Sequence, residues 1–234
     1  MPVRYKQFQR NKKKEFNNML ILLKQYAIIS KNIKFSLTHI TNKGRNILFK
    51  THGQSIYHNL IHTYSSKFCT SLQSIELKEP LKVLNIHQNL TLMSIQMNGY
   101  ISKLNKGRNQ NDIQFLYLNN RPVDLKNIAK SITSVYKKYS PSNTSTSPAI
   151  FLNLILPSEK FDVNVTPNKR TVFLHHEKEL LYTINEYFTK LLEPSQYTHQ
   201  VIAINSKNSP NILVDKRTTL DITTTTTNTS SIIV

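Results

Sequence analysis

The sequence contains little glycine and almost no cysteine. Its 234 residues include four glycines, Gly44, Gly53, Gly99 and Gly107. No two of them are close enough in sequence to form the glycine-rich loop that cradles a nucleotide phosphate. The single cysteine, Cys69, excludes an internal disulfide. Because Cys69 follows a phenylalanine, we expect a buried, unreactive thiol.

The sequence also lacks the patterns of a metal site and of a membrane span. His175 and His176 are adjacent, but neighbouring strand residues point to opposite faces, and no Cys or carboxylate set completes a ligand shell. The apolar stretch 19–29 is half the length of a membrane span and is interrupted by Lys24 and Gln25. The basic N-terminus is not followed by the apolar core of a signal peptide. We therefore expect a soluble intracellular protein without a bound metal.

Acidic residues are scarce, since 13 Asp and Glu face 31 Lys and Arg, which gives a formal net charge of +18. The cations fall into three groups: Arg4, Lys6, Arg10, Lys12, Lys13 and Lys14; Lys103, Lys106 and Arg108; and Arg121, Lys126, Lys130, Lys137 and Lys138. Such groups attract a polyanion by releasing its counterions, which predicts nucleic-acid binding that depends on salt and is largely blind to sequence. The alternative is a Lys- and Asn-rich composition that decorates a neutral surface.

Low-complexity sequence is confined to the C-terminal end of the chain. Residues 194–234 are rich in Ser, Thr and Asn and include five consecutive threonines at 223–227. Such polar runs cannot bury enough apolar surface to offset chain entropy. The sequence therefore predicts one folded domain over residues 1–193 and a disordered C-terminal tail over 194–234.

The hydrophobic periodicity predicts an α+β fold. Helical spacing predicts a first helix over 7–29 and another that follows Asp124, its expected N-cap, while Ser55 is the expected N-cap of a short helix between them. Alternating patterns predict strands over 33–40, 45–51, 94–103, 114–119 and 150–156, of which the first two form a hairpin. This order of elements predicts a mixed sheet with a helix pair on one face.

One segment, residues 161–170, combines a strand-like pattern with a turn that carries two cations. Residues 161–166 alternate between apolar and polar, which predicts a half-buried strand. Pro167 ends that strand because it has no N–H to donate. Lys169 then offers a point charge to a phosphate, and Arg170 offers a fork to a carboxylate or a phosphate. The alternative is a solvated turn with two solubilising charges.

Three stretches resemble the MutL mismatch-repair family, and most closely its eukaryotic post-meiotic-segregation branch. They are PVRYKQFQRNKKKEF at 2–16, QFLYLNNRP at 114–122 and DVNVTPNKR at 162–170, and they occur in the order and spacing of that family. The resemblance covers roughly residues 2–192. It implies the transducer domain of the family's N-terminal half, with the split βαβ topology of a ribosomal protein and of gyrase transducer domains, including a left-handed crossover.

The resemblance also implies that an ATPase domain is missing from this chain. In the family the nucleotide sits mainly in a preceding domain, whose Asn- and Glu-bearing helix, Asp-x-Gly-x-Gly turn and glycine-rich lid do not occur here. We therefore expect a fragment, a split gene product or a misread frame that is inactive alone and has no cofactor of its own. ATP and Mg belong to the complete family protein.

Residue roles follow from the resemblance where the motifs match. Lys169 matches the lysine that reaches the terminal phosphate of the nucleotide, and Lys126 falls near a basic position that contacts DNA. Asn119, Arg121, Pro167 and Arg170 are expected to shape two turns, with Arg121 bracing the first by hydrogen bonding. The full DNA-contact set predicted is Arg4, Lys6, Arg10, Lys12, Lys13, Lys14, Lys106, Arg108, Lys126 and Lys130. Asn120 and Ile113 depart from the family pattern.

The implied partners are those of a mismatch-repair protein in the nucleus. They are double-stranded or mismatched DNA, a second MutL-family subunit in a heterodimer, and a MutS-type recognition complex, with no membrane. No nuclease motif of the family's distal metal domain is present. Two alternatives stay open: an RNA- or ribosome-binding protein of the same fold, and an inactive remnant, which the truncation and the threonine-rich tail favour.

Overall fold

The structure is a computed structural model that describes residues 2–78, 82–84, 90–92, 95–141 and 146–193. Residues 194–234, for which the sequence predicts a tail, lie outside the described residues. None of the helices in the described part of the chain combines the length and hydropathy needed to span a membrane.

The chain opens with a helix and a hairpin. The helix α1 (Pro2–Ile29) includes the predicted range 7–29 and extends it, because proline suits the first position of a helix. Its first half is exposed, and its buried residues lie at the C-terminal end. The strands β1 (Phe35–Thr41) and β2 (Gly44–Thr51) pair antiparallel, with Thr41 opposite Gly44. The predicted hairpin is therefore confirmed.

Two short helices follow. The Ser55 hydroxyl accepts a hydrogen bond from the His58 N–H (3.2 Å) and caps α2 (Ile56–Thr63), as the sequence predicts. The next helix is α3 (Ser66–Thr70). The Asn59 side chain of α2 donates to the Ile28 carbonyl (3.2 Å), and Cys69 of α3 shares an apolar cluster with Ile28, so both helices pack near the C-terminal end of α1.

A five-stranded mixed sheet forms the centre of the domain. Its order is β3 (Leu72–Leu77), β6 (Gln96–Ser102), β9 (Ile150–Ile155), β7 (Gln114–Leu118) and β8 (Arg121–Val123). All neighbours are antiparallel except β7 and β9, which run parallel. The predicted strands 94–103, 114–119 and 150–156 are confirmed with slightly shorter bounds. The mixed pairing confirms the α+β fold.

One glycine is required inside this sheet. A Cβ built on Gly99 in β6 would lie 1.9 Å from the carbonyl oxygen of Phe151 in β9. No side chain fits at that distance, so β6 and β9 approach closely only because residue 99 is glycine.

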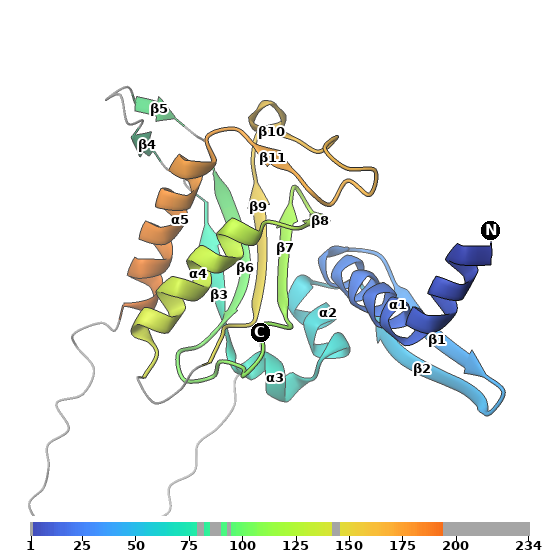
Figure 1. The fold of residues 1–234 in the computed structure, drawn as a ribbon. Helices are drawn as coiled ribbons and strands as arrows, with labels where there is room; N and C mark the ends of the chain where they lie inside the picture. Colours follow the sequence, from blue (N-terminus) through green and yellow to red (C-terminus); the bar gives the residue numbers. More distant parts are fainter. Residues whose placement is uncertain (1, 79–81, 85–89, 93–94, 142–145, 194–234) are drawn as a thin grey trace, which may run out of the picture. The chain divides into compact units, whose positions relative to one another are not determined.

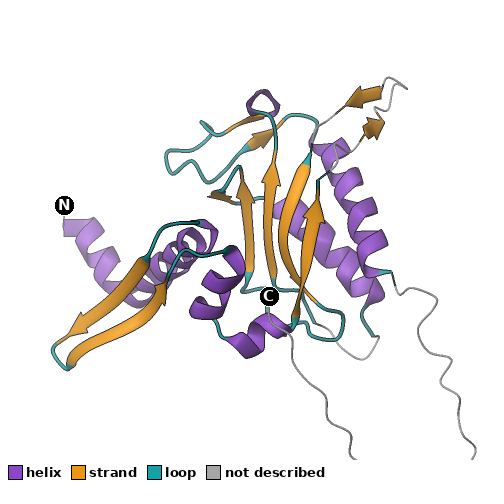
Figure 2. Ribbon diagram, turned by 180° about the vertical axis from the view of Figure 1, so that it is seen from behind, coloured by secondary structure: helices purple, strands orange, loops and turns teal. Residues whose placement is uncertain are grey.

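The helices α4 (Lys126–Tyr139) and α5 (Glu177–Leu192) cover one face of the sheet, as predicted (Figure 1). Strand alternation places Leu116 and Leu152 on this side, where they join the core beneath the two helices. Phe115 and Phe151 point to the other side, where the end of α1 packs with α2 and α3 (Figure 2). Both faces of the sheet are therefore buried.

The predicted N-cap of α4 is wrong. Leu125, not Asp124, occupies the N-cap position, and no side chain caps this helix. The Asp124 carboxylate instead binds Arg170, 46 residues later in the chain. A charged partner competes successfully with the backbone N–H groups of the first helical turn because charge-assisted forks are the stronger hydrogen bonds.

The predicted strand over 161–166 is wrong beyond its second residue. Only β10 (Phe161–Asp162) is extended, and it pairs with β11 (Phe173–Leu174) after the short 3-10 helix η1 (Ser158–Lys160). The Asp162 carboxylate accepts from the Asn164 N–H (2.8 Å), which turns the chain away from the ladder. The remaining described strands are β4 (Lys82–Leu84) and β5 (Leu90–Leu92), which pair with each other.

Candidate phosphate-contact turn and cationic surfaces

The Lys169 turn, which runs from Thr166 to Arg170, is shaped by its own hydrogen bonds. The Lys169 N–H donates to the Thr166 carbonyl (2.8 Å) and closes a β-turn. Pro167 takes the second position of this turn, where its fixed φ fits. The Asn168 side-chain oxygen accepts from the Thr166 hydroxyl (2.9 Å) and from the Arg170 N–H (3.1 Å).

Lys169 itself lies in the left-handed region, with φ of 52°. This conformation is unfavourable for residues other than glycine and, to a lesser degree, asparagine and aspartate. Its side chain is exposed, and within the described residues no hydrogen bond or ion pair engages its ammonium group. The turn therefore presents an unpartnered cation that can meet an external anion.

Arg170 faces the domain instead of solvent. Its guanidinium forms a fork on the Asp124 carboxylate, with Nη2 at 2.7 Å from Oδ1 and Nε at 3.2 Å from Oδ2. Its Nη1 donates to the Gln25 side-chain oxygen in α1 (3.0 Å). The sequence predicts that Arg170 binds either a carboxylate or a phosphate. In the structure it binds a carboxylate of this chain, in keeping with the structural role expected of it in the turn.

A second turn joins β7 to β8 and contains two left-handed asparagines. Asn119 has φ of 49° and Asn120 has φ of 65°. The Asn119 side chain makes paired hydrogen bonds with the backbone of Leu156, donating to its carbonyl and accepting from its N–H, each at 2.9 Å. The Arg121 Nε is buried, and it has no hydrogen-bond partner among the residues that the structure describes. The bracing expected of Arg121 is therefore supplied by Asn119.

A groove of about 570 Å³ lies between the Lys169 turn and the middle of α1. Its lining from α1 includes Glu15 and Met19, and its lining from the other side includes Asp124, Asn168 and Arg170. The groove has carboxylates of its own, so it is not a simple anion pocket. It does place the Lys169 turn beside α1.

The predicted DNA-contact residues of α1 are all exposed. They are Arg4, Lys6, Arg10, Lys12, Lys13 and Lys14. They share one half of one helix with a single carboxylate, Glu15, at its end. We call the exposed cations of this half of the helix the α1 cationic surface.

The cations of the loop between β6 and β7 lie elsewhere. The Tyr136 hydroxyl near the end of α4 donates to the Lys103 carbonyl (2.8 Å), so this loop meets the opposite end of α4 from Asp124. Arg108 forks onto Asp112, with Nη2 at 2.7 Å from Oδ2, and this hydrogen bond lowers the pKa of the Asp112 carboxyl. Lys106 and Arg108 are therefore not brought together with Lys169.

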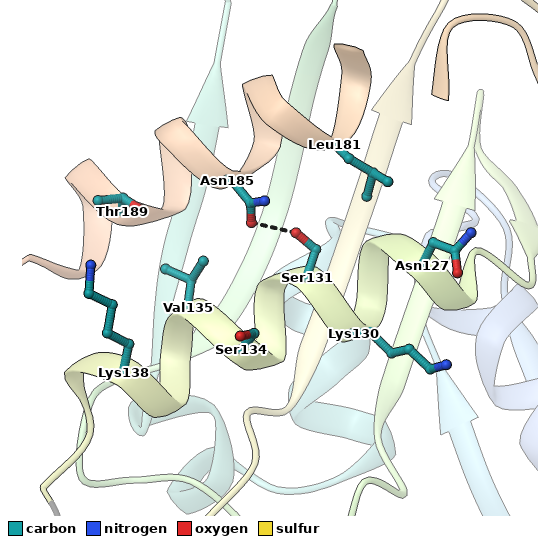
Figure 3. A pocket seen from close by; sticks show the side chains of 9 residues that line it. All are labelled: Asn127, Lys130, Ser131, Ser134, Val135, Lys138, Leu181, Asn185 and Thr189. Atoms are coloured by element: carbon teal, nitrogen blue, oxygen red, sulfur yellow. Dashed lines mark hydrogen bonds between the residues drawn. The ribbon is translucent and has the colours of Figure 1, made fainter. Parts of the chain in front are cut away.

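Helix α4 carries Lys126 and Lys130 on its outer face, as predicted. Lys130 also lines a shallow groove between α4 and α5, together with Lys138 (Figure 3). Ser131 hydrogen-bonds Asn185 across this groove and joins the two helices. Lys130 and Lys138 therefore border this groove, which Val135 and Leu181 also line, whereas Lys126 is exposed outside it.

The sequence prediction missed two residues of the site. Gln25 and Asp124 hold Arg170, and they stand 145 and 46 residues away from it in the chain. No local pattern signals such contacts. The local pattern around Asp124, a carboxylate directly before a helix, predicts a helix cap and not a contact with Arg170.

Two further sequence predictions concern the potential metal ligands and the single cysteine. Within the described residues no three His, Cys, Asp or Glu side chains are placed to hold a metal ion. Cys69 is buried, and this burial raises the pKa of its thiol. The predicted burial of the thiol is therefore confirmed, and its low reactivity stays a prediction.

Comparison with known proteins decides the family. The family model described as DNA mismatch repair protein, C-terminal domain, matches residues 60–193. The chain belongs to the MutL family of DNA mismatch-repair proteins, in its post-meiotic-segregation branch. The match spans the sheet, the helix pair and the Lys169 turn, whereas α1, with its cationic surface and Gln25, precedes the matched residues.

Relatives share about a third of the sequence over most of this chain. DNA mismatch repair protein PMS1 of Saccharomyces cerevisiae is 34% identical over 211 residues, which cover 81% of this chain and 24% of that protein. Mismatch repair endonuclease PMS2 of Mus musculus is 36% identical over 194 residues, 77% of this chain and 22% of its own. The chain thus spans about a quarter of the length of these relatives.

A solved structure agrees with the fold. The crystal structure of the N-terminal domain of a DNA repair protein superposes with a TM-score of 0.72 at 36% identity. It covers 82% of this chain and 57% of the other. The sheet and helix pair described above are therefore the family's fold.

Proposed function

We propose that this chain contacts DNA and senses a nucleotide phosphate within a MutL-type mismatch-repair ATPase, whose ATPase domain is a separate segment. The observation that carries the proposal is the Lys169 turn. An exposed lysine without a partner is held there in an unfavourable backbone conformation, and such strain persists where the surroundings fix it and function uses it. A preorganised cation stabilises the charge that develops as a phosphate is cleaved.

The surfaces of α1 and the hairpin support completion by another domain. Val3 and Phe8 of α1 and Ile40 and Ile47 of the hairpin are more than half exposed, at 76%, 51%, 67% and 60%. Exposed large apolar side chains of this kind are typical of a surface that another protein segment covers. We propose that the family's ATPase domain, which would bring ATP and Mg, covers them.

DNA contact is tested by salt dependence. We expect the full chain to bind duplex DNA with micromolar-range affinity that weakens about a hundredfold or more between 50 and 200 mM salt. Replacing Lys12, Lys13 and Lys14 together by Glu should weaken binding to all DNA sequences about equally, because phosphate contacts do not read bases. Fluorescence anisotropy measures both effects.

Two outcomes of this experiment would count against DNA contact. Binding that does not change with salt would mean that the α1 cationic surface is not used. Clearly tighter binding to duplex RNA than to duplex DNA would favour the RNA-binding alternative. The matched control replaces Lys31, Lys34 and Lys43 by Glu. These lysines are also exposed, so the control changes the net charge by the same amount in another part of the chain.

The phosphate contact is tested by joining a family ATPase domain ahead of this chain. The chain alone should neither hydrolyse nor retain ATP in calorimetry. Joined behind a family ATPase domain, it should support slow hydrolysis, and Lys169→Ala should lower kcat by about ten- to a thousandfold. If the variant folds and its kcat is unchanged, the Lys169 turn is only a solvated turn.

Partners and location follow from the same proposal. We propose a second MutL-family subunit, a MutS-type complex and the nucleus as its setting. Co-purification of the tagged chain with a MutL-family protein, and imaging of the same chain in cells, test the two points. Recovery with ribosomes in place of a MutL-family protein would support the alternative of ribosome binding.

A further inference from the structure

One guanidinium joins three parts of the domain. Arg170 of the Lys169 turn binds Asp124, which precedes α4, and Gln25, which belongs to α1. We call these three residues the Arg170 latch. Its side chains are only partly open to solvent, with 23% of the Arg170 side chain and 45% of the Asp124 side chain exposed.

The backbone strengthens the same junction. The Arg170 carbonyl accepts from the Asp124 N–H (2.8 Å), so the two residues are joined by main chain and side chain together. The Arg170 N–H is held by the Asn168 side chain at 3.1 Å. Lys169 lies in the chain between Asn168 and Arg170, which these hydrogen bonds hold in place. Its unfavourable φ is therefore imposed from both sides.

The latch also rests on a rigid support. Gln25 is 6% exposed, and its main-chain carbonyl accepts from the hydroxyl of Tyr117 in β7 (3.1 Å). Tyr117 is 1% exposed and belongs to the core between the sheet and the end of α1. Arg170 is thereby tied to the central sheet through Gln25, not to another surface loop.

We propose that Arg170, with Asp124 and Gln25, is a positioning group that fixes where Lys169 presents its ammonium. This inference rests on the proposed phosphate contact of Lys169. Each of the three guanidinium nitrogens of Arg170 donates to a group of this chain, so in this proposal Arg170 acts through Lys169. A group held within a fraction of an ångström contributes to catalysis what a loosely held one does not.

The first test uses the chain as it is. Asp124→Asn and Arg170→Lys should each speed hydrogen exchange of the Lys169 and Asp124 amides at least tenfold, measured by NMR, while amides of β6 and β9 stay unchanged. Asp112→Asn is the matched control, because it breaks the other Arg–Asp fork seen in the described part of the chain, far from Lys169. Unchanged exchange at Lys169 in both latch variants would overturn the inference.

The second test separates positioning from stability. With the ATPase domain joined, Asp124→Asn should lower kcat about tenfold when Lys169 is present and by less than twofold when Lys169→Ala is combined with it. A purely structural defect would lower kcat equally in both backgrounds and would overturn the inference. Gln25→Glu, which keeps an acceptor for Arg170, should retain kcat, whereas Gln25→Met should not.

The two proposals fail in different ways. If Lys169→Ala leaves kcat unchanged, the phosphate contact itself is wrong. If Lys169→Ala lowers kcat but Asp124→Asn and Gln25→Met do not, Lys169 works without the latch, and only the positioning inference is wrong.

Discussion

The turn between β7 and β8 and the Lys169 turn both contain left-handed residues, and these residues are held in opposite ways. At the turn between β7 and β8 the left-handed residue makes the contacts itself, since the Asn119 amide pairs with the Leu156 backbone. At the Lys169 turn the left-handed residue keeps its side chain free, and its neighbours Asn168 and Arg170 make the contacts. The first turn therefore serves packing, and the second holds a side chain that packing does not use.

The residue types at the left-handed positions, asparagine in the first turn and lysine in the second, agree with this difference. Asparagine tolerates the left-handed region because its short amide bonds to nearby backbone. Lysine gains nothing of that kind, so its presence in the second turn costs stability without a local return. The comparison predicts that substitutions will affect stability strongly in the first turn and weakly, or with the opposite sign, in the second.

The largest effect is expected at Asn119. Asn119→Ala should lower the free energy of unfolding by about 2–3 kcal/mol, since two hydrogen bonds at roughly 1 kcal/mol each are lost and alanine is strained at this φ. Asn119→Gly should lower it less, because glycine accepts the conformation. Urea denaturation of the full chain measures both. Equal losses would mean that backbone strain contributes nothing there.

Asn168 gives the corresponding substitution in the Lys169 turn. Asn168→Ala should lower the free energy of unfolding by only about 1 kcal/mol, because its side chain accepts two hydrogen bonds in an exposed place. Asn168→Asp keeps the acceptor and should be close to neutral. A loss as large as that of Asn119→Ala would remove the contrast between the turns.

Lys169 should show the opposite sign. Lys169→Gly should raise the free energy of unfolding by roughly 0.5–1 kcal/mol, because glycine relieves the strained φ. Lys169→Ala removes the same charge but keeps the strain, so it should bring no gain. If both variants are equally stable, the strain at residue 169 is not real in solution.

The smallest effect is expected at the Arg108–Asp112 ion pair, which lies outside both of these turns. The lowered pKa of Asp112 means that its contribution to stability is present above the ordinary carboxyl pKa and is lost as the pH falls through the folded value. Both partners are over a third exposed, so Asp112→Asn should cost less than about 1 kcal/mol at pH 7. The difference from the parent chain should vanish in acid.

Local signals predicted the local parts of this structure. The hairpin turn between Thr41 and Gly44, the Ser55 cap and the apolar face of α4 all follow from residues close together in the sequence. The prediction of a strand over 161–166 was wrong because no neighbouring strand pairs with the chain beyond Asp162. A pattern of apolar residues states which face would be buried, but not whether a strand is available to cover it.

The candidate site likewise has one part that the local sequence predicts and one part that it does not. The free cation of Lys169 was visible in the sequence, since an exposed turn after Pro167 needs no distant information. Its supports were not, because Gln25 and Asp124 reach Arg170 from other elements. Only the folded chain shows which of two neighbouring cations is bound and which is free.

The buried thiol has a practical consequence. Cys69 is the one cysteine of the chain, it is 1% exposed, and burial raises its pKa, so it should react slowly with maleimides at neutral pH. A cysteine introduced at an exposed position would then carry the label alone. A spin or fluorescent probe at Val165, placed in this way, would report the motion of the Lys169 turn without removing any native residue of the core.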